Sequence, residues 1–119
     1  MTTRDIAGKL VALCRQGKFE DAQKELFSPD ATSMEAEDSP MGPRETKGLK
    51  AITEKGRRFM SMVEKIHSMS VSDPIVADSS FACTMSLDAT MKGQGRSAMT
   101  ETCVYDVKDG KIVSEQFHI

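Results

Sequence analysis

The hydrophobic period changes from about 3.6 residues to 2 in the second half of the chain, and this change constrains the fold more than any other feature. Residues 81–91, FACTMSLDATM, carry apolar side chains at every second position, which is typical of a strand with one buried face. Residues 97–107, SAMTETCVYDV, follow a KGQGR turn, and a tight KDGK turn leads into residues 112–119, IVSEQFHI. The pattern predicts long antiparallel strands joined by hairpins.

The first half of the chain has helical periodicity and predicts three helices. The first is capped by Thr2 or Thr3 and ends near Gly17, the second covers residues 18–27, and the third covers about residues 48–64. Their apolar positions are Ile6, Leu10 and Leu13, then Phe19, Ala22 and Leu26, then Leu49, Ile52, Phe59, Met60 and Val63. Helices followed by a strand meander predict the α+β class, with the helices packed on one face of a curved, mostly antiparallel sheet.

Length and charge narrow the class of protein. A chain of 119 residues is long enough for one domain with a real core, so we expect a single domain over residues 1–119. The 16 basic and 18 acidic residues are spread without blocks, which argues against nucleic-acid and membrane partners. No segment approaches the roughly 20 apolar residues of a membrane span.

The metal-binding and redox-active residue types are few. Cys14, Cys83 and Cys103 are widely spaced without a CxxC motif, which favours reduced, buried thiols over a disulfide framework or a metal site. His67 and His118 are the only histidines and have no paired spacing. We therefore expect a cytoplasmic protein with no metal site and no cofactor.

Two glutamates lie where the strand patterns predict apolar faces. Glu101 falls on the same face as Met99, Cys103 and Tyr105, and Glu35 closes a short alternating segment, DATSMEAE, at residues 30–37. An unpaired buried carboxylate is costly and tends to take up a proton. The residues leave two alternatives open. In the first, Glu35 lies in water at a strand edge and Glu101 pairs with Arg57 or Arg58. In the second, both acids face a pocket.

The register of the last hairpin is also open. A two-residue turn at Asp109 and Gly110 brings His118 opposite Glu101, whereas a three-residue loop with a bulge at Gly110 brings Phe117 there, alongside Glu115.

Three segments of the chain resemble the NTF2-like (cystatin-like) fold and, within it, the SnoaL-like polyketide cyclases and ketosteroid isomerases. They are GKFEDAQKELFSPDATSMEAE at residues 17–37, GPRETKGLKAI at residues 42–52 and CVYDVKDGKIV at residues 103–113. The resemblance implies a cone of three N-terminal helices on a curved sheet, and a homodimer formed through the outer face of that sheet.

The resemblance also implies a site. Glu35 falls on the position of the isomerases' catalytic aspartate, and the inner face is expected to hold Phe81, Cys83, Met85, Leu87, Glu101, Cys103, Glu115, Phe117 and Ile119. This placement favours the bulged hairpin. The two groups that hold the enolate oxygen in the isomerases correspond here to Leu10 and Cys103, so steroid isomerisation by that mechanism is not expected.

The hypothesis from the sequence is a small pocket protein for an apolar ligand, acting as a cofactor-free isomerase, cyclase or dehydratase on a carbonyl compound. Glu35 moves the proton, and a protonated Glu101, with Glu115, binds the oxygen. The predicted ligand-binding residues are Phe59, Phe81, Met85, Cys103, Glu115 and Phe117. The alternative is a non-catalytic module that binds a ligand or serves as a dimeric interaction domain.

Overall fold

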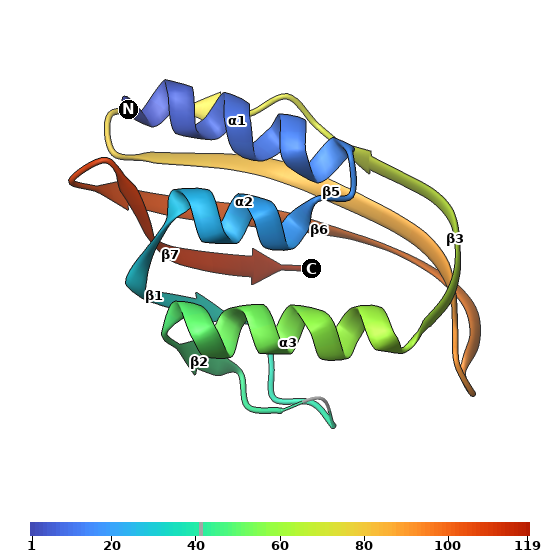
Figure 1. The fold of residues 1–119 in the computed structure, drawn as a ribbon. Helices are drawn as coiled ribbons and strands as arrows, with labels where there is room; N and C mark the ends of the chain where they lie inside the picture. The colour runs from blue at the N-terminus through green and yellow to red at the C-terminus, as the bar shows by residue number, and fades with distance from the viewer. Residues whose placement is uncertain (41) are drawn as a thin grey trace.

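Three helices pack on one face of a curved, seven-stranded sheet (Figure 1). A computed structural model describes residues 1–40 and 42–119. The helices are α1 (Thr3–Arg15), α2 (Phe19–Leu26) and α3 (Leu49–Ser61). The strands are β1 (Phe27–Met34), β2 (Glu45–Lys47), β3 (Val63–Val71), β4 (Ile75–Val76), β5 (Ser80–Met91), β6 (Gly95–Lys108) and β7 (Lys111–His118).

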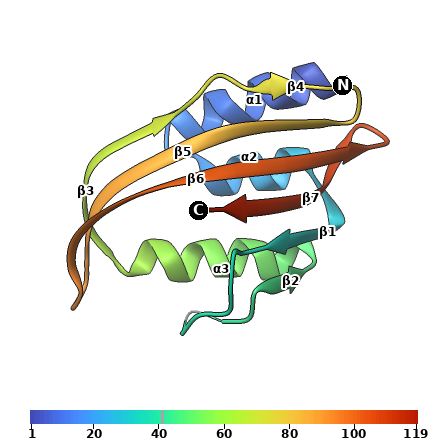
Figure 2. The ribbon, with the colours of Figure 1, turned by 180° about the vertical axis from the view of Figure 1, so that it is seen from behind.

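The strand order is β2-β1-β7-β6-β5-β3, and β4 pairs with β5. Neighbouring strands are antiparallel except for β1 and β7, which run parallel. Seen from behind, the strands lie in front of the helices, and β3, β5 and β6 curve around towards the end of α3 (Figure 2). The curvature gives the sheet a concave face, which the helices cover.

The first helix begins where the sequence predicts, and Thr2 is its cap. The Thr2 hydroxyl accepts a hydrogen bond from the Asp5 amide, and the Asp5 carboxylate accepts one from the Thr2 amide, each 3.1 Å long. This reciprocal pair is a capping box. Ile6 and Leu10 of this helix are buried against the sheet, as their helical spacing predicts. No helix in the described part of the chain is long and apolar enough to cross a bilayer.

The third helix is shorter than predicted. It ends at Ser61, and Val63, expected on its apolar stripe, instead opens β3 opposite Met91 of β5. Met60, also expected on the stripe, is 43% exposed. Val63 and the residues after it form a strand instead of a further helical turn, because β5 is long enough to pair with them. β3 therefore starts at Val63, inside the range predicted for the third helix.

The long hairpin of β5 and β6 follows the predicted alternation. Phe81, Cys83 and Ala89 of β5 are buried, and the Cα partners of the first two are Tyr105 and Cys103. The odd-numbered residues of both strands therefore face the helices, and the even-numbered ones face outward.

The last hairpin has neither of the two predicted registers. Asp109 and Gly110 form a two-residue turn between Lys108 and Lys111, with φ of 53° and 75°, as a type I′ turn requires. The register then shifts, because Val107 pairs with Ile112 but Asp106 pairs with Ser114, which leaves Val113 as the extra residue of a bulge. The bulge is thus in β7 and not at Gly110.

The bulge places Glu115 opposite Tyr105 and Phe117 opposite Cys103. Both side chains consequently lie on the concave face with Glu101, as the resemblance implies. His118 pairs with Thr102 on the outer face.

Candidate functional site

The residues of the concave face form rows of paired residues that run across neighbouring strands. The row nearest the last hairpin is the most deeply buried. The innermost row joins β5, β6, β7 and β1 through pairs between Phe81, Tyr105, Glu115 and Ser33. All four are buried, with exposed fractions between 0% and 4%. This end of the face is filled by packed side chains.

The outer rows are more open. Cys83 and Cys103 form the next pair and are buried, but in the following rows Met85 and Glu101 are half-buried and Met99 is 45% exposed. The concave face is therefore fully packed near the last hairpin and less tightly packed at Met85, Glu101 and Met99, whereas Ala89 further along β5 is buried again.

Glu115 is a carboxyl group in the packed end of this face. It is 4% exposed, and the Ser33 hydroxyl donates a 2.9 Å hydrogen bond to its Oε1. Burial raises the pKa of Glu115 to about 7, against the opposing effects of the Ser33 hydrogen bond and the Lys55 charge. A large fraction of Glu115 is therefore protonated at neutral pH.

Lys55 links Glu35 to the buried pair of Ser33 and Glu115. It extends from α3, and its Nζ donates 2.9 Å hydrogen bonds to Ser33 Oγ and to Glu35 Oε1. The ammonium also lies 5.8 Å from the centroid of the Phe117 ring. Its side chain is only 17% exposed, so its charge is partly desolvated.

The structure settles where Glu35 lies. Glu35 follows the last residue of β1, and its amide donates to the Arg44 carbonyl oxygen at 2.8 Å, which fixes the chain at the start of the loop. Its side chain is 38% exposed and forms an ion pair with Lys55. Glu35 is thus neither an isolated solvated charge nor a desolvated acid without a partner.

Within residues 1–40 and 42–119, Glu101 differs from Glu35 and Glu115 in having no hydrogen-bond or ion-pair partner for its carboxyl group. Arg57, one of its two expected partners, instead binds Glu20 through two nitrogens, 2.5 and 3.1 Å from the carboxylate oxygens. Among the described residues, no side chain forms a hydrogen bond or ion pair with Glu101. Burial, followed by the charge of Glu35, raises the pKa of Glu101 to about 7, against the opposing effect of Lys55. Of the two alternatives, the one in which Glu101 pairs with Arg57 or Arg58 is therefore wrong.

The predicted ligand-binding residues fall into two groups. Phe81 stacks on Tyr105, with ring centroids 4.8 Å apart and an angle of 18° between the planes, and Cys103 is fully buried. Hydrogen bonding to Cys83 and burial raise the pKa of the Cys103 thiol, which disfavours a nucleophilic role. Phe59, Met85 and Phe117 are half-buried and are the more accessible members of the set.

Lys55 and Ser33 were not among the sequence candidates. Lys55 carries a signal that could have identified it, because it lies three residues after Ile52 and four before Phe59, in the middle of the apolar stripe of α3. Ser33 has no comparable signal, since a serine on a strand is ordinary. No three His, Cys, Asp or Glu side chains of residues 1–40 and 42–119 are grouped so as to hold a metal ion.

The arrangement suits proton transfer. The Glu35 carboxyl group, paired with Lys55, lies near two carboxyl groups whose pKa values are raised to about 7. A general base and a general acid in one site require this difference in protonation.

Comparisons with known proteins identify the family. The sequence profile of the SnoaL-like domain matches residues 1–119. A candidate SnoaL-like polyketide cyclase from Mesorhizobium loti, also described as a carbohydrate phosphatase, is 32% identical, with 100% of each chain covered and a TM-score of 0.91. No curated protein matches the chain.

Two more distant structures share the fold. An NTF2-like protein from Burkholderia thailandensis is 16% identical, with 98% of this chain and 89% of that chain covered and a TM-score of 0.83. A protein from Catenulispora acidiphila with a ketosteroid isomerase-like fold, in complex with trimethylamine, is 20% identical, with 99% and 87% covered and a TM-score of 0.74. The expected NTF2-like architecture is confirmed, and the chain belongs to the SnoaL-like domain family.

Proposed function

We propose that this protein is a cofactor-free enzyme that moves protons on an apolar carbonyl compound, with Glu35 as the base and Glu101 as the acid. The observation that carries the proposal is the set of Glu35, Glu101 and Glu115 on one concave face, with Lys55 paired to Glu35. The fold class, which includes isomerases, cyclases and ligand-binding proteins, is compatible with this function.

The mechanism is based on the raised pKa of Glu101 and on the ion pair between Glu35 and Lys55. Glu35 accepts a proton from the carbon next to the carbonyl group, while the Glu101 carboxyl donates a hydrogen bond to the carbonyl oxygen. Return of the proton to another carbon completes an isomerisation. The half-buried Phe59, Met85 and Phe117 supply apolar contacts to the ligand, and Phe81, Cys103 and Glu115 close the inner end of the site.

The test is exchange of carbon-bound hydrogen in D₂O. Cyclic ketones of increasing size are incubated with the protein, and loss of the proton signal next to the carbonyl group is followed by NMR. At least one ketone is expected to exchange faster with the protein than with buffer alone. If ketones bind but none exchanges, the protein is not an enzyme of this kind and the second candidate function, a binding module, is favoured.

The second candidate is a binding module without catalysis. The fully packed inner end of the concave face favours it, because Phe81, Tyr105 and Cys103 leave only the outer rows for a ligand. The trimethylamine complex of the Catenulispora acidiphila protein shows a small molecule bound to a protein of similar fold. In this reading the carboxyl groups bind the ligand and do not transfer protons.

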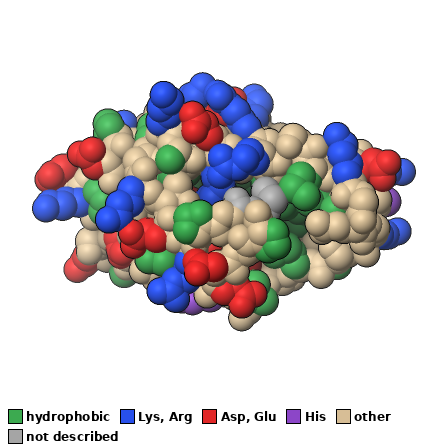
Figure 3. All heavy atoms as spheres, turned by 90° about the horizontal axis from the view of Figure 1, so that it is seen from below, with side chains coloured by type: hydrophobic (Ala, Val, Ile, Leu, Met, Phe, Trp, Pro, Cys, Tyr) green, Lys and Arg blue, Asp and Glu red, His purple; other side chains and the backbone are tan. Residues whose placement is uncertain are grey.

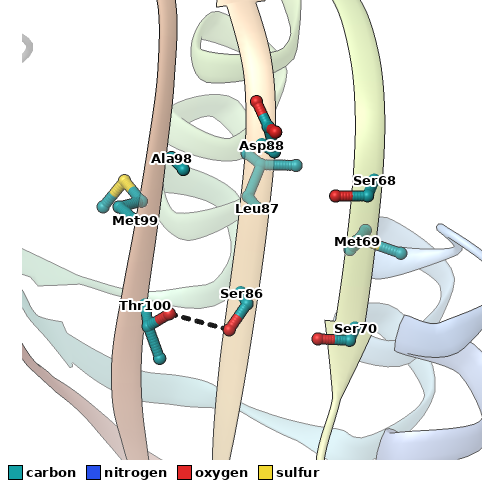
Figure 4. A pocket seen from close by; sticks show the side chains of 9 residues that line it. All are labelled: Ser68, Met69, Ser70, Ser86, Leu87, Asp88, Ala98, Met99 and Thr100. Atoms are coloured by element: carbon teal, nitrogen blue, oxygen red, sulfur yellow. Dashed lines mark hydrogen bonds between the residues drawn. The ribbon is translucent and has the colours of Figure 1, made fainter.

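The proposed assembly is a homodimer formed through the outer face of the sheet. On the side of this face formed by β6, β5 and the edge strand β3, the hydroxyl-bearing residues Ser70, Ser86 and Thr100 lie side by side, and the last two share a 2.8 Å hydrogen bond (Figure 4). The charged residue beside them, Asp88, is paired with Arg96. A shallow hollow of about 330 Å³ lies at this point of the face. Uncharged polar side chains are easier to bury against a partner than charged ones.

The dimer predicts a solution mass of twice the 13.1 kDa of the chain, measured by light scattering after gel filtration. Thr100→Glu together with Thr102→Glu places carboxylates in the interface and is expected to give the mass of one chain. Ser79→Glu, in the exposed turn before β5, is the control and should not change the mass. A wild-type protein with the mass of one chain contradicts the proposal.

We also propose one domain over residues 1–119, located in the cytoplasm. The three cysteines are free and buried, which agrees with a reducing compartment. The face shown in Figure 3 carries both basic and acidic side chains, which supports the expectation that neither nucleic acid nor a membrane is a partner.

A further inference from the structure

We propose that Lys55 is a catalytic residue whose ammonium group binds the substrate oxygen on which negative charge develops. This inference rests on the proposed function and assigns it a second oxygen-binding group besides Glu101. It also limits the substrate to compounds whose carbonyl oxygen can approach Lys55 while the adjacent C–H bond faces Glu35.

The geometry of Lys55 leaves one donor for a ligand. A lysine ammonium has three N–H groups, and two of them are used by Ser33 and Glu35. Among the described residues, no oxygen or nitrogen accepts the third. The adjacent Phe117 ring and the low exposure of the side chain reduce competition from water, so a hydrogen bond from this donor is strengthened.

The pairing of Lys55 with Glu35 suits the movement of charge in the reaction. Before proton transfer the negative charge is on Glu35. When the C–H bond breaks, its electron pair forms the C=C bond of the enolate, the carbonyl π pair moves to oxygen, and the proton forms an O–H bond on Glu35. The charge has then moved to the substrate oxygen, and Lys55 still has an anionic neighbour, so no unpaired charge is left in the site.

Ser33 keeps Lys55 in place during this change. Its hydroxyl accepts a hydrogen bond from Lys55 and donates one to Glu115, and neither contact depends on the charge of Glu35. The ammonium therefore keeps a fixed attachment when Glu35 becomes neutral. Such preorganisation favours the transition state over the ground state.

The test uses 4-nitrophenol, whose ionised form absorbs visible light and resembles an enolate. Glu35→Gln reproduces the neutral state of the base, and this variant is expected to bind the phenol as its anion. Adding Lys55→Met should weaken binding of the anion roughly tenfold or more, the cost of a lost charge-assisted hydrogen bond. Adding Lys55→Arg, which keeps the charge, should restore most of the affinity.

The matched control is Lys50→Met in the Glu35→Gln background, because Lys50 is an exposed lysine of the same helix. It should bind the anion as Glu35→Gln does. Should the Lys55→Met variant fail to fold, Lys55→Gln replaces it, since glutamine keeps hydrogen-bond donors and removes the charge. Equal affinity for the anion with and without Lys55, or binding of the neutral phenol only, overturns the proposal.

The two proposals fail separately. If the wild-type protein exchanges no ketone but the phenol anion still depends on Lys55, the proposed function is wrong and Lys55 remains an anion-binding group. If ketone exchange occurs and Lys55→Met leaves its maximal rate unchanged, the function stands and the role of Lys55 is wrong. A role limited to structure would move the urea midpoint of unfolding without changing which form of the phenol binds.

Discussion

Replacing Glu35 by Gln is expected to lower the rate of ketone exchange by about 10²- to 10⁴-fold, the usual contribution of a positioned general base. Glutamine has nearly the same size and can still accept the hydrogen bond from Lys55, but its amide oxygen is not basic enough to take a proton from carbon. Ligand affinity should change by only a few fold. The measurement is the NMR exchange rate at saturating ketone.

Glu37→Gln is the control for this prediction, since Glu37 is an exposed glutamate of the following loop. It should leave the rate unchanged.

The pH dependence gives an independent check, because Glu101 must be protonated to act as the acid and its pKa is raised to about 7. The exchange rate should therefore fall as the pH rises through about 7. For the base, equal exchange rates for Glu35→Gln and wild type would show that Glu35 does not take the proton.

The second large effect concerns stability. Glu115→Gln is expected to stabilise the protein by about 3 kcal/mol at pH 8 and by less than about 1 kcal/mol at pH 5. The pKa of Glu115 is raised from 4.5 to about 7 in the folded protein. Between these values the folded state binds more protons than the unfolded state, so the contribution of Glu115 to stability falls as the pH rises through this window, and glutamine avoids the loss.

Urea unfolding of both proteins at several pH values measures this difference. Glutamine keeps an acceptor for the Ser33 hydroxyl, so the comparison isolates the charge. Glu64→Gln, on the exposed side of β3, should show no such dependence on pH. A gap between Glu115→Gln and wild type that stays constant from pH 5 to pH 8 would mean that Glu115 does not change its protonation in this range.

Features set by local periodicity could be predicted from the sequence. The faces of β5 and β6 follow from strict alternation, so Phe81, Cys83 and Cys103 were placed correctly on the inner face. The helices likewise follow from apolar spacing, and Thr2 from its capping pattern. These signals involve residues close together in the chain.

Features set by distant contacts could not be predicted. The bulge at Val113 accompanies the pairing of β7 with β1, in which Glu115 lies beside Ser33, and turn chemistry at Asp109 and Gly110 contains no information about that partner. The ion pair of Lys55 with Glu35 depends in the same way on how α3 crosses the sheet. The acids of the site were visible in the sequence, but their partners were not.

The bulge in β7 means that Glu115 faces inward only because one extra residue, Val113, precedes it in the strand. Glu115 is four positions after Lys111, and Val113 is the position that breaks the alternation. In a relative with a regular hairpin, the residue three positions after the equivalent of Lys111 would point inward instead. Aligning such a relative column by column would pair its inward residue with the outward Ser114, so insertions near this turn should be checked before an inner acid is declared missing.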